Sequence, residues 1–198
     1  MTRLVVGITG ATGSIYGIRL LQILRSYPAV ETHLIVSRPG KRTIVEETDF
    51  SVAEVEGLAT HRHELTDIGA AIASGSFLTA GMVIAPCSIK TAAAIAACYA
   101  DNLITRAADV TLKEGRPLIL LVRETPLHVG HLKCMLALAE MGAVLLPPMP
   151  AFYNRPRDLD DLVNHTIARV LDRLKLPQTL VAEWKGTHPR TAPDTLRA

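Results

Sequence analysis

The stretch 5-VVGITGATGSIYG-17 runs from a β-branched apolar segment into glycines at positions 7, 10, 13 and 17. The apolar residues predict a buried strand, and a helical pattern begins at residue 14. Glycine lets the main chain turn tightly between two such elements, and it also lets backbone N–H groups approach an anion at the positive end of a helix. The stretch therefore predicts a strand–loop–helix unit and leaves open whether the loop binds a phosphate or only makes the turn.

The spacing of these glycines argues against a nicotinamide dinucleotide. It is G-x-x-G-x-x-G, whereas the dinucleotide-binding motif is G-x-G-x-x-G. An NAD site also places an acidic residue at the end of the second strand, where this chain has Ser37 followed by Arg38. NAD is therefore disfavoured, and Arg38 leaves an NADP site open. Thr12 adds a hydroxyl to the glycine loop.

Strand and helix patterns alternate along the rest of the chain. Apolar runs typical of buried parallel strands occur at residues 3–9, 33–37, 81–86, 117–123 and 143–147. Helical patterns follow at residues 14–26, 39–48, 88–99, 102–114, 128–141 and 158–174. This alternation predicts the α/β class with a doubly wound parallel sheet, whose ligands bind at the carboxyl ends of the strands.

Composition narrows the possible functions. With 198 residues, 48% of them hydrophobic, the chain suits one domain, which we place at residues 1–186 with a tail at 187–198. The N-terminal residues show neither a signal peptide nor a membrane-spanning pattern, so we expect a cytoplasmic protein. The net charge of +2, with no basic stripe interleaved with aromatic residues, predicts no binding to nucleic acid.

Two further features of the composition concern burial. The mean hydropathy of +0.25 is high for a small monomer, and 91-TAAAIAACYA-100 is small and apolar almost all round. Such a helix lies either in the core or in a subunit interface, and we favour the interface, and with it a homo-oligomer.

Cys87, Cys98 and Cys134 are odd in number and set among apolar residues, which predicts buried, reduced thiols.

Two predicted strand ends carry groups suited to an anion. Ser88, Lys90 and Thr91 lie at the start of a helix, although an ordinary N-cap serine would give the same pattern. Arg123 stands beside Glu124 at the end of the fourth strand. This pair either clamps a phosphate and exchanges a proton, or forms a structural ion pair.

Other basic and aromatic residues lie on the later helices and loops. Arg106 and Lys113 are seven residues apart and so project from nearly the same helix face, as an anion site or a solvated stripe. A proline-rich loop presents Phe152 and Tyr153, and Arg169 follows on the last helix. The loop either closes over a flat ligand or caps the core. We expect the basic residues to gather at the strand ends.

The sequence predicts no metal site. His61 with His63, and His128 with His131, lack the carboxylate or cysteine partners that a metal site needs, and we interpret them as surface or core histidines. The aspartates at positions 158, 160 and 161 lie at a helix start, which the helix dipole favours. They do not form the D-D-x-x-D cluster with which many prenyl-diphosphate enzymes bind magnesium.

Seven motifs occur in order between residue 3 and about residue 186: GITGATGSIYG, EETDF, SGSF, PCSIKT, NLITRAADVTLKEGRPL, VRETPL and PPMPAFYNRP. Together they resemble the flavin prenyltransferase family, the UbiX-type proteins formerly described as aromatic-acid decarboxylases. The resemblance implies a Rossmann-like flavoprotein fold with three α/β/α layers, FMN binding and a dodecamer. It also implies that dimethylallyl phosphate and reduced FMN give phosphate and FMN prenylated at N5 and C6, without a metal, for a partner UbiD-type decarboxylase.

The same resemblance assigns the site residues. The family's FMN contacts fall on Gly10, Ala11, Thr12, Ser37, Ser88, Ile89, Lys90, Thr91 and Arg123. Its contacts with the prenyl phosphate fall on Arg106, Lys113, Arg123, Glu124, Tyr153 and Arg169. Its catalytic residues fall on Thr12, Glu47, Lys113, Glu124 and Trp184. Thr12 replaces the serine of the commoner glycine loop and keeps its hydroxyl.

The family chemistry implies a role for each of the catalytic side chains. The basic residues neutralise the phosphate as its C–O bond breaks. Glu47 serves the proton movements of ring closure, and Glu124 passes a proton to the departing phosphate. Trp184 closes the site and shields the allylic fragment from water.

Three other functions are weighed against this one. A flavin-dependent decarboxylase would act on an aromatic acid or a peptidyl cysteine, and a carrier would deliver FMN to a decarboxylase without catalysis. Cations beyond those that FMN itself requires argue against the carrier. An NADP-dependent reductase of the short-chain class would need a Tyr-x-x-x-Lys pair, which this chain lacks.

Overall fold

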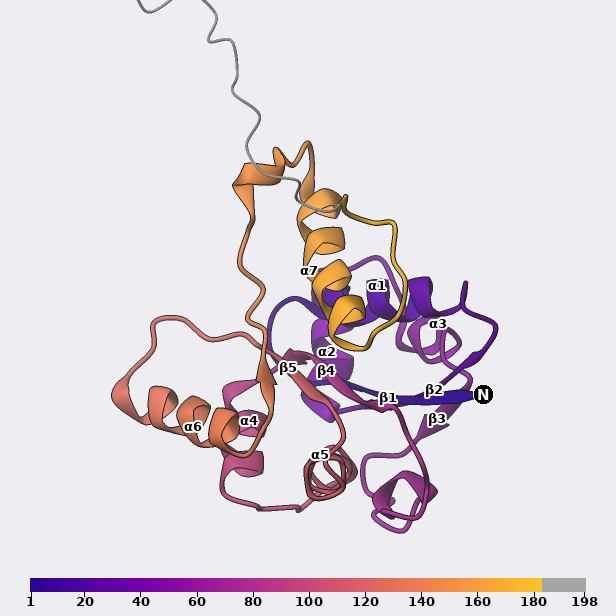
Figure 1. Cartoon of the computed structure of the whole chain (residues 1–198), viewed down its shortest axis with the longest axis vertical. Helices are drawn as coiled ribbons and strands as arrows, with labels where there is room; N and C mark the ends of the chain where they lie inside the picture. Colours follow the sequence, from indigo (N-terminus) through magenta and orange to yellow (C-terminus); the bar gives the residue numbers. More distant parts are fainter. Residues whose placement is uncertain (183–198) are drawn as a thin grey trace, which may run out of the picture.

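Six parallel strands form one sheet, in the order β3-β2-β1-β4-β5-β6 (Figure 1). The structure is a computed structural model, and it describes residues 1–182. The strands are β1 (Thr2–Ile8), β2 (Val30–Val36), β3 (His61–His63), β4 (Gly81–Cys87), β5 (Leu118–Val122) and β6 (Val144–Leu145). Successive strands are added to one side of β1 up to β3 and to its other side from β4 on, as in the Rossmann fold. The strand order therefore confirms the predicted doubly wound sheet.

Helices cover both faces of the sheet and complete three layers. They are α1 (Ser14–Leu24), α2 (Arg38–Glu47), α3 (Val52–Glu56), α4 (Ile89–Ala96), α5 (Leu103–Lys113), α6 (Val129–Glu140) and α7 (Leu159–Arg173). Figure 1 shows α1, α3 and α7 on one side of the sheet and α4, α5 and α6 on the other. Two short 3-10 turns, η1 (Ala71–Ala73) and η2 (Phe152–Asn154), lie in the connections.

The alternation of side chains along each strand divides the core in two. In β1, Leu4, Val6 and Ile8 pack with α1, α2, α3 and α7, whereas Val5 packs with α4, α5 and α6. The strands β4 and β5, and β1 from Leu4 onward, are buried on both faces, which is why these segments are apolar and could be recognised in the sequence.

The third strand was missed by the sequence prediction. β3 is the polar tripeptide HRH, and it is a strand because it pairs with β2 at the edge of the sheet. An edge strand of three polar residues has no apolar run, so hydrophobic periodicity does not detect it. The five-residue helix α3 was missed too. Its N-cap is Ser51, whose hydroxyl and the Glu54 carboxylate form a capping box.

Two expectations about burial come out differently. Cys87 is buried, and this burial raises its pKa to about 12, but Cys134 is only half-buried and Cys98 is exposed, so the prediction of three buried thiols is wrong. In α4, Ala92 and Ile95 are buried and the other small residues are partly buried. Within the described residues, no helix has the length and hydropathy needed to cross a membrane.

Candidate functional site

A cavity of about 470 Å³ opens at the carboxyl ends of β1 and β4, where the strand order reverses. Ligands of doubly wound sheets bind at this position. The cavity is lined by the glycine loop, the starts of α2 and α4, and the end of β5. These segments contribute Gly10, Ala11, Thr12, Ser37, Ser88, Ile89, Lys90, Thr91, Arg123 and Glu124. The structure thus brings together the residues expected to contact FMN, and it adds Glu124.

The start of α4 is built to receive an anion. The Thr9 hydroxyl oxygen accepts a hydrogen bond of 2.8 Å from the backbone N–H of Ser88, which fixes the turn between β4 and the helix. The Ser88 hydroxyl caps the helix by accepting from the Thr91 N–H at 3.3 Å. The backbone N–H groups of Ile89 and Lys90 have no acceptor within residues 1–182. Free N–H groups at a helix start, with the helix dipole behind them, attract a negative charge.

The start of α1 already holds an anion from the chain itself. Glu47, at the end of α2, accepts hydrogen bonds at its Oε2 from the backbone N–H groups of Gly13 at 2.8 Å and Ser14 at 3.1 Å. A Cβ on Gly10 would lie 2.2 Å from the Cβ of Pro39, so the loop packs tightly on the start of α2. The glycine loop therefore lines the cavity while its helix binds the carboxylate of Glu47, and contact of the loop with a phosphate stays a prediction.

The charges around this cavity are balanced. Lys90 and Arg123 line it, and among residues 1–182 neither side chain forms an ion pair. Asp101 and Glu124 line it as well, and Glu124 accepts a hydrogen bond of 3.0 Å from the N–H of the next residue. The two cations therefore remain available to a bound phosphate ester, with a carboxyl group close by for proton transfer.

Apolar side chains form another part of the lining. They are Leu65, Ile89, Ala94 and Ile104, together with the exposed ring of Tyr99. A cavity that combines apolar side chains with free N–H groups suits a ligand with a flat ring at one end and a phosphate at the other.

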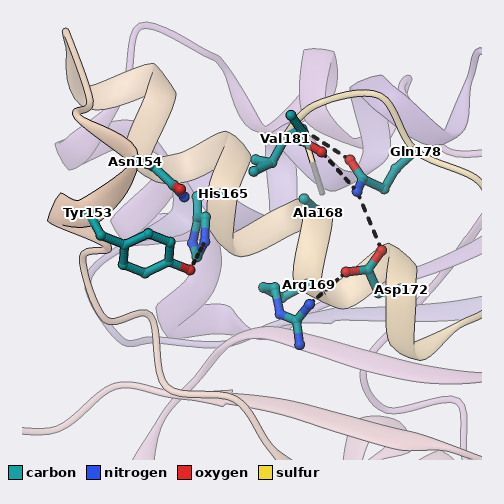
Figure 2. Close-up of a pocket in the computed structure, with 9 residues that line it drawn as sticks. Tyr153, Asn154, His165, Ala168, Arg169, Asp172, Gln178 and Val181 are labelled. Carbon is teal, nitrogen blue, oxygen red and sulfur yellow. Dashed lines mark hydrogen bonds and ion pairs between the residues drawn. The ribbon is translucent and has the colours of Figure 1, made fainter. Parts of the chain in front are cut away.

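Tyr153 and Arg169 lie at a second cavity, of about 940 Å³, between η2 and α7 (Figure 2). The Tyr153 hydroxyl and His165 Nε2 are 3.3 Å apart, and Arg169 pairs with Asp172 at 2.9 Å. Burial, with the charge of Arg169 nearby, lowers the pKa of His165, so its ring is neutral at pH 7. Gln178 also lines this cavity, and its side-chain amide lies 3.4 Å from Asp172.

Arg106 and Lys113 lie on α5, outside both cavities. Arg106 pairs with Asp109 at 2.9 Å, and Lys113 pairs with Glu114. The helix starts beside the first cavity, at the carboxyl ends of the strands, and runs back to the amino end of β5. Lys113 therefore lies near the amino ends of the strands, away from the cavity. A single chain therefore does not bring Arg106 and Lys113 to the first cavity, and their expected contact with the prenyl phosphate stays a prediction. Trp184 lies outside the described residues.

One cluster of titratable groups was not foreseen. The expectation that His61 and His63 lack a carboxylate partner is wrong, because Glu31 Oε1 lies 2.6 Å from His61 Nε2. The register of β2 and β3 places His33 opposite His61. Glu31 and His33 share one face of a strand by their spacing, and this signal is visible in the sequence. Their partners are 30 residues away in a strand that the sequence does not reveal.

The chain is similar to known flavoproteins over most of its length. The model of the flavoprotein family matches residues 1–171. Flavin prenyltransferase UbiX of Escherichia coli strain K12 is 58% identical over 188 residues, which cover 94% of this chain and 100% of that protein.

Two solved structures are similar over nearly the whole chain. A dodecameric FMN-dependent UbiX-like decarboxylase from Escherichia coli O157:H7 aligns with a TM-score of 0.92 at 53% identity, covering 93% of this chain and 100% of that one. AnUbiX (PadA1), in complex with FMN and dimethylallyl pyrophosphate, aligns with a TM-score of 0.92 at 44% identity, covering 94% of this chain and 99% of that one.

Proposed function

The chain belongs to the flavin prenyltransferase family of flavoproteins, and on this premise we propose that it transfers a dimethylallyl group from a phosphate ester to reduced FMN. The product is FMN prenylated at N5 and C6, and it serves a partner UbiD-type decarboxylase. The observation that carries this proposal is the cavity between β1 and β4, where free N–H groups and two cations that are unpaired within residues 1–182 meet apolar side chains. A relative of similar structure holds FMN and a dimethylallyl ester together.

The start of α4 fits the phosphate of FMN. The N–H groups of Ile89 and Lys90 would donate to its oxygens, and the hydroxyls of Ser88 and Thr91 lie beside them. The apolar wall would hold the ring system. When bound and reduced, FMN supplies the nucleophile for the transfer.

The residues of the chain would then assist the leaving group. Arg123 carries a planar guanidinium that matches a phosphate with two hydrogen bonds, and it neutralises charge as the C–O bond breaks. Glu124, beside it at the same cavity, donates a proton to the departing phosphate. The apolar residues exclude water, which would otherwise capture the allylic fragment.

We propose that an assembly of copies completes this site. Arg106, Lys113, Tyr153 and Arg169 lie outside the first cavity of their own chain, although the family pattern assigns them to the prenyl phosphate. Large apolar side chains are exposed on α6 and on the loop around η2, notably Val129, Leu132, Leu136, Met149 and Phe152. Exposed large apolar side chains are typical of subunit interfaces. A homododecamer, the form of one relative, would cover them and bring basic residues from neighbouring copies to the cavity.

Phosphate release tests the reaction. The purified chain, incubated without oxygen with reduced FMN and dimethylallyl phosphate, should release inorganic phosphate, and omission of FMN should abolish the release. An FMN carrier would bind FMN without releasing phosphate. A decarboxylase would instead release CO₂ from an aromatic acid in the absence of any partner. Parallel assays with dimethylallyl phosphate and the diphosphate show which ester is preferred.

Replacing Ser88 with alanine tests the phosphate position. The variant loses the cap of α4, which costs about 1 kcal/mol of stability, and it loses a hydroxyl beside the phosphate. We expect the Kd for FMN, measured by quenching of flavin fluorescence, to rise about tenfold or more, since a hydrogen bond to a charged group contributes about 1.5–3 kcal/mol.

A second N-cap serine provides the control for this variant. Ser51 caps α3 with the same geometry and does not line the cavity. Ser51→Ala should therefore lose similar stability and keep the wild-type Kd for FMN. Equal Kd values for Ser88→Ala and the wild type would remove the start of α4 from the FMN site.

A further inference from the structure

A cluster of four side chains lies at the edge of the sheet, on β2 and β3. Glu31 and His33 come from β2, and His61 and His63 come from β3. The rings of His33 and His61 stack with their centroids 4.7 Å apart, and those of His33 and His63 with theirs 5.2 Å apart. None of the four lines the cavity described above, so the proposed prenyl transfer does not use them.

Three atoms of this cluster have the spacing of metal ligands. Glu31 Oε1 lies 2.6 Å from His61 Nε2 and 3.5 Å from His33 Nε2, and the three atoms all lie within 4.8 Å of one another. Ligands in a tetrahedral zinc site, with bonds of about 2.0–2.2 Å, are separated by about 3.3 Å. The observed separations lie on both sides of this value, so small rotations of the side chains would bring the three atoms to distances at which they could coordinate one ion.

His33 provides the second observation. Its side chain is buried, with the residue only 4% exposed, and among residues 1–182 its Nε2 has no hydrogen-bond partner, although Glu31 Oε1 lies 3.5 Å away. A buried imidazole nitrogen without a hydrogen-bond partner costs stability, and a bound metal ion would satisfy it.

The surrounding residues already hold the ligands in place. His33 Nδ1 shares a hydrogen bond of 3.0 Å with His63 Nε2, which orients the ring as outer partners do in metal sites. Arg3 holds the other oxygen of Glu31, with its Nε 3.3 Å from Oε2, and its guanidinium rests on the ring of Phe77. Arg3 is positively charged and weakens cation binding, but it contacts Oε2, whereas Oε1 faces the Nε2 atoms of His61 and His33.

We propose that Glu31, His33 and His61 bind a divalent ion of the zinc class, with solvent at the fourth position. The side chain of His61 is 48% exposed, so the ion has a path from solvent and an open coordination site. Two ligands come from β2 and one from β3, so the ion would fasten this short edge strand to the sheet. Two histidines and a glutamate are a ligand set that zinc commonly takes.

Titration of the untagged protein with Zn²⁺ tests this site. After treatment with a chelator, the wild type should bind one Zn²⁺ per chain by calorimetry. Co²⁺ should give the visible absorption of a tetrahedral site. Zn²⁺ should also raise the unfolding temperature. His61→Ala should weaken binding by more than about tenfold and abolish the rise, and His63→Phe should weaken it by about 10–100-fold through loss of the outer hydrogen bond.

An exposed neighbour on the same segment provides the control. Glu64→Gln removes a carboxylate that lies outside the ligand set, so it should bind Zn²⁺ like the wild type. Because His61 is half exposed, its replacement should leave the fold intact, which unfolding in the presence of chelator would verify. The proposal is overturned if the wild type shows no saturable binding, or if His61→Ala binds Zn²⁺ as tightly as the wild type. Neither result depends on prenyl transfer.

Discussion

Replacing Arg123 with alanine is expected to lower kcat/KM for dimethylallyl phosphate by about 10²–10³-fold, the usual cost of removing one preorganised group that stabilises developing charge. Arg123 lines the cavity at the end of β5, and its backbone N–H donates to Cys87 O at 3.1 Å, which fixes the strand end. Its guanidinium has no ion-pair partner among residues 1–182, unlike those of Arg106 and Arg169. Phosphate release under saturating reduced FMN measures the effect.

Two further variants make this result specific. Arg123→Lys keeps the charge but loses the planar fork, so it should recover only part of the activity. Arg42→Ala removes an arginine that is exposed on α2 and paired with Glu46, and it should retain wild-type kcat/KM. Wild-type kcat/KM in Arg123→Ala would show that the leaving phosphate lies elsewhere.

Replacing Gly17 with alanine should destabilise the fold. A Cβ at Gly17 of α1 would lie 2.3 Å from the carbonyl oxygen of Ala85 in β4 and 2.8 Å from Ile8 Cγ1. Backbone atoms in a buried sheet cannot move aside cheaply, so α1 must shift, and overpacking of this kind costs about 1–3 kcal/mol or more. For a domain of this size, a loss of 1 kcal/mol lowers Tm by roughly 2–4 °C, which thermal unfolding can measure.

The control is a buried glycine that has room for a side chain. A Cβ at Gly7 in β1 would lie 3.5 Å from Ile84 and 3.6 Å from Ile104, which is ordinary contact. Gly7→Ala should therefore unfold near the wild-type Tm. If Gly17→Ala and Gly7→Ala unfold at the same temperature, α1 is not held against β4 as described.

The buried parts of the fold were predictable because their sequences are locally unambiguous. β4, β5 and the buried part of β1 are apolar runs. The helices that follow have a polar residue at the first position, as in α1, or at the N-cap, as in α4 and α6. β3 was not predictable, since its three polar residues form a strand only through pairing with β2. Long-range pairing at a sheet edge leaves no signal in the spacing of hydrophobic residues.

The residues of the candidate site, like the elements of the fold, include some that the sequence could predict and some that it could not. The glycine loop and the residues around Ser88 were predictable as strand ends, and the sheet order brings them to one cavity. The hydrogen bonds of Glu47 to the start of α1 were not predictable. Glu47 lies 34 residues from Gly13 in the sequence and approaches it only through the packing of α2. The positions of Arg106 and Lys113 depend on which way α5 runs from the cavity, and the seven-residue spacing of the two side chains does not give that direction.

The mass of the flavin product tests the central claim most directly. The purified chain should be incubated without oxygen with reduced FMN and dimethylallyl phosphate, and the released flavin should be analysed by mass spectrometry. The account predicts FMN enlarged by one C₅H₈ unit, formed in proportion to the phosphate released. Recovery of unmodified FMN as the sole flavin, from protein that binds both compounds, would contradict it.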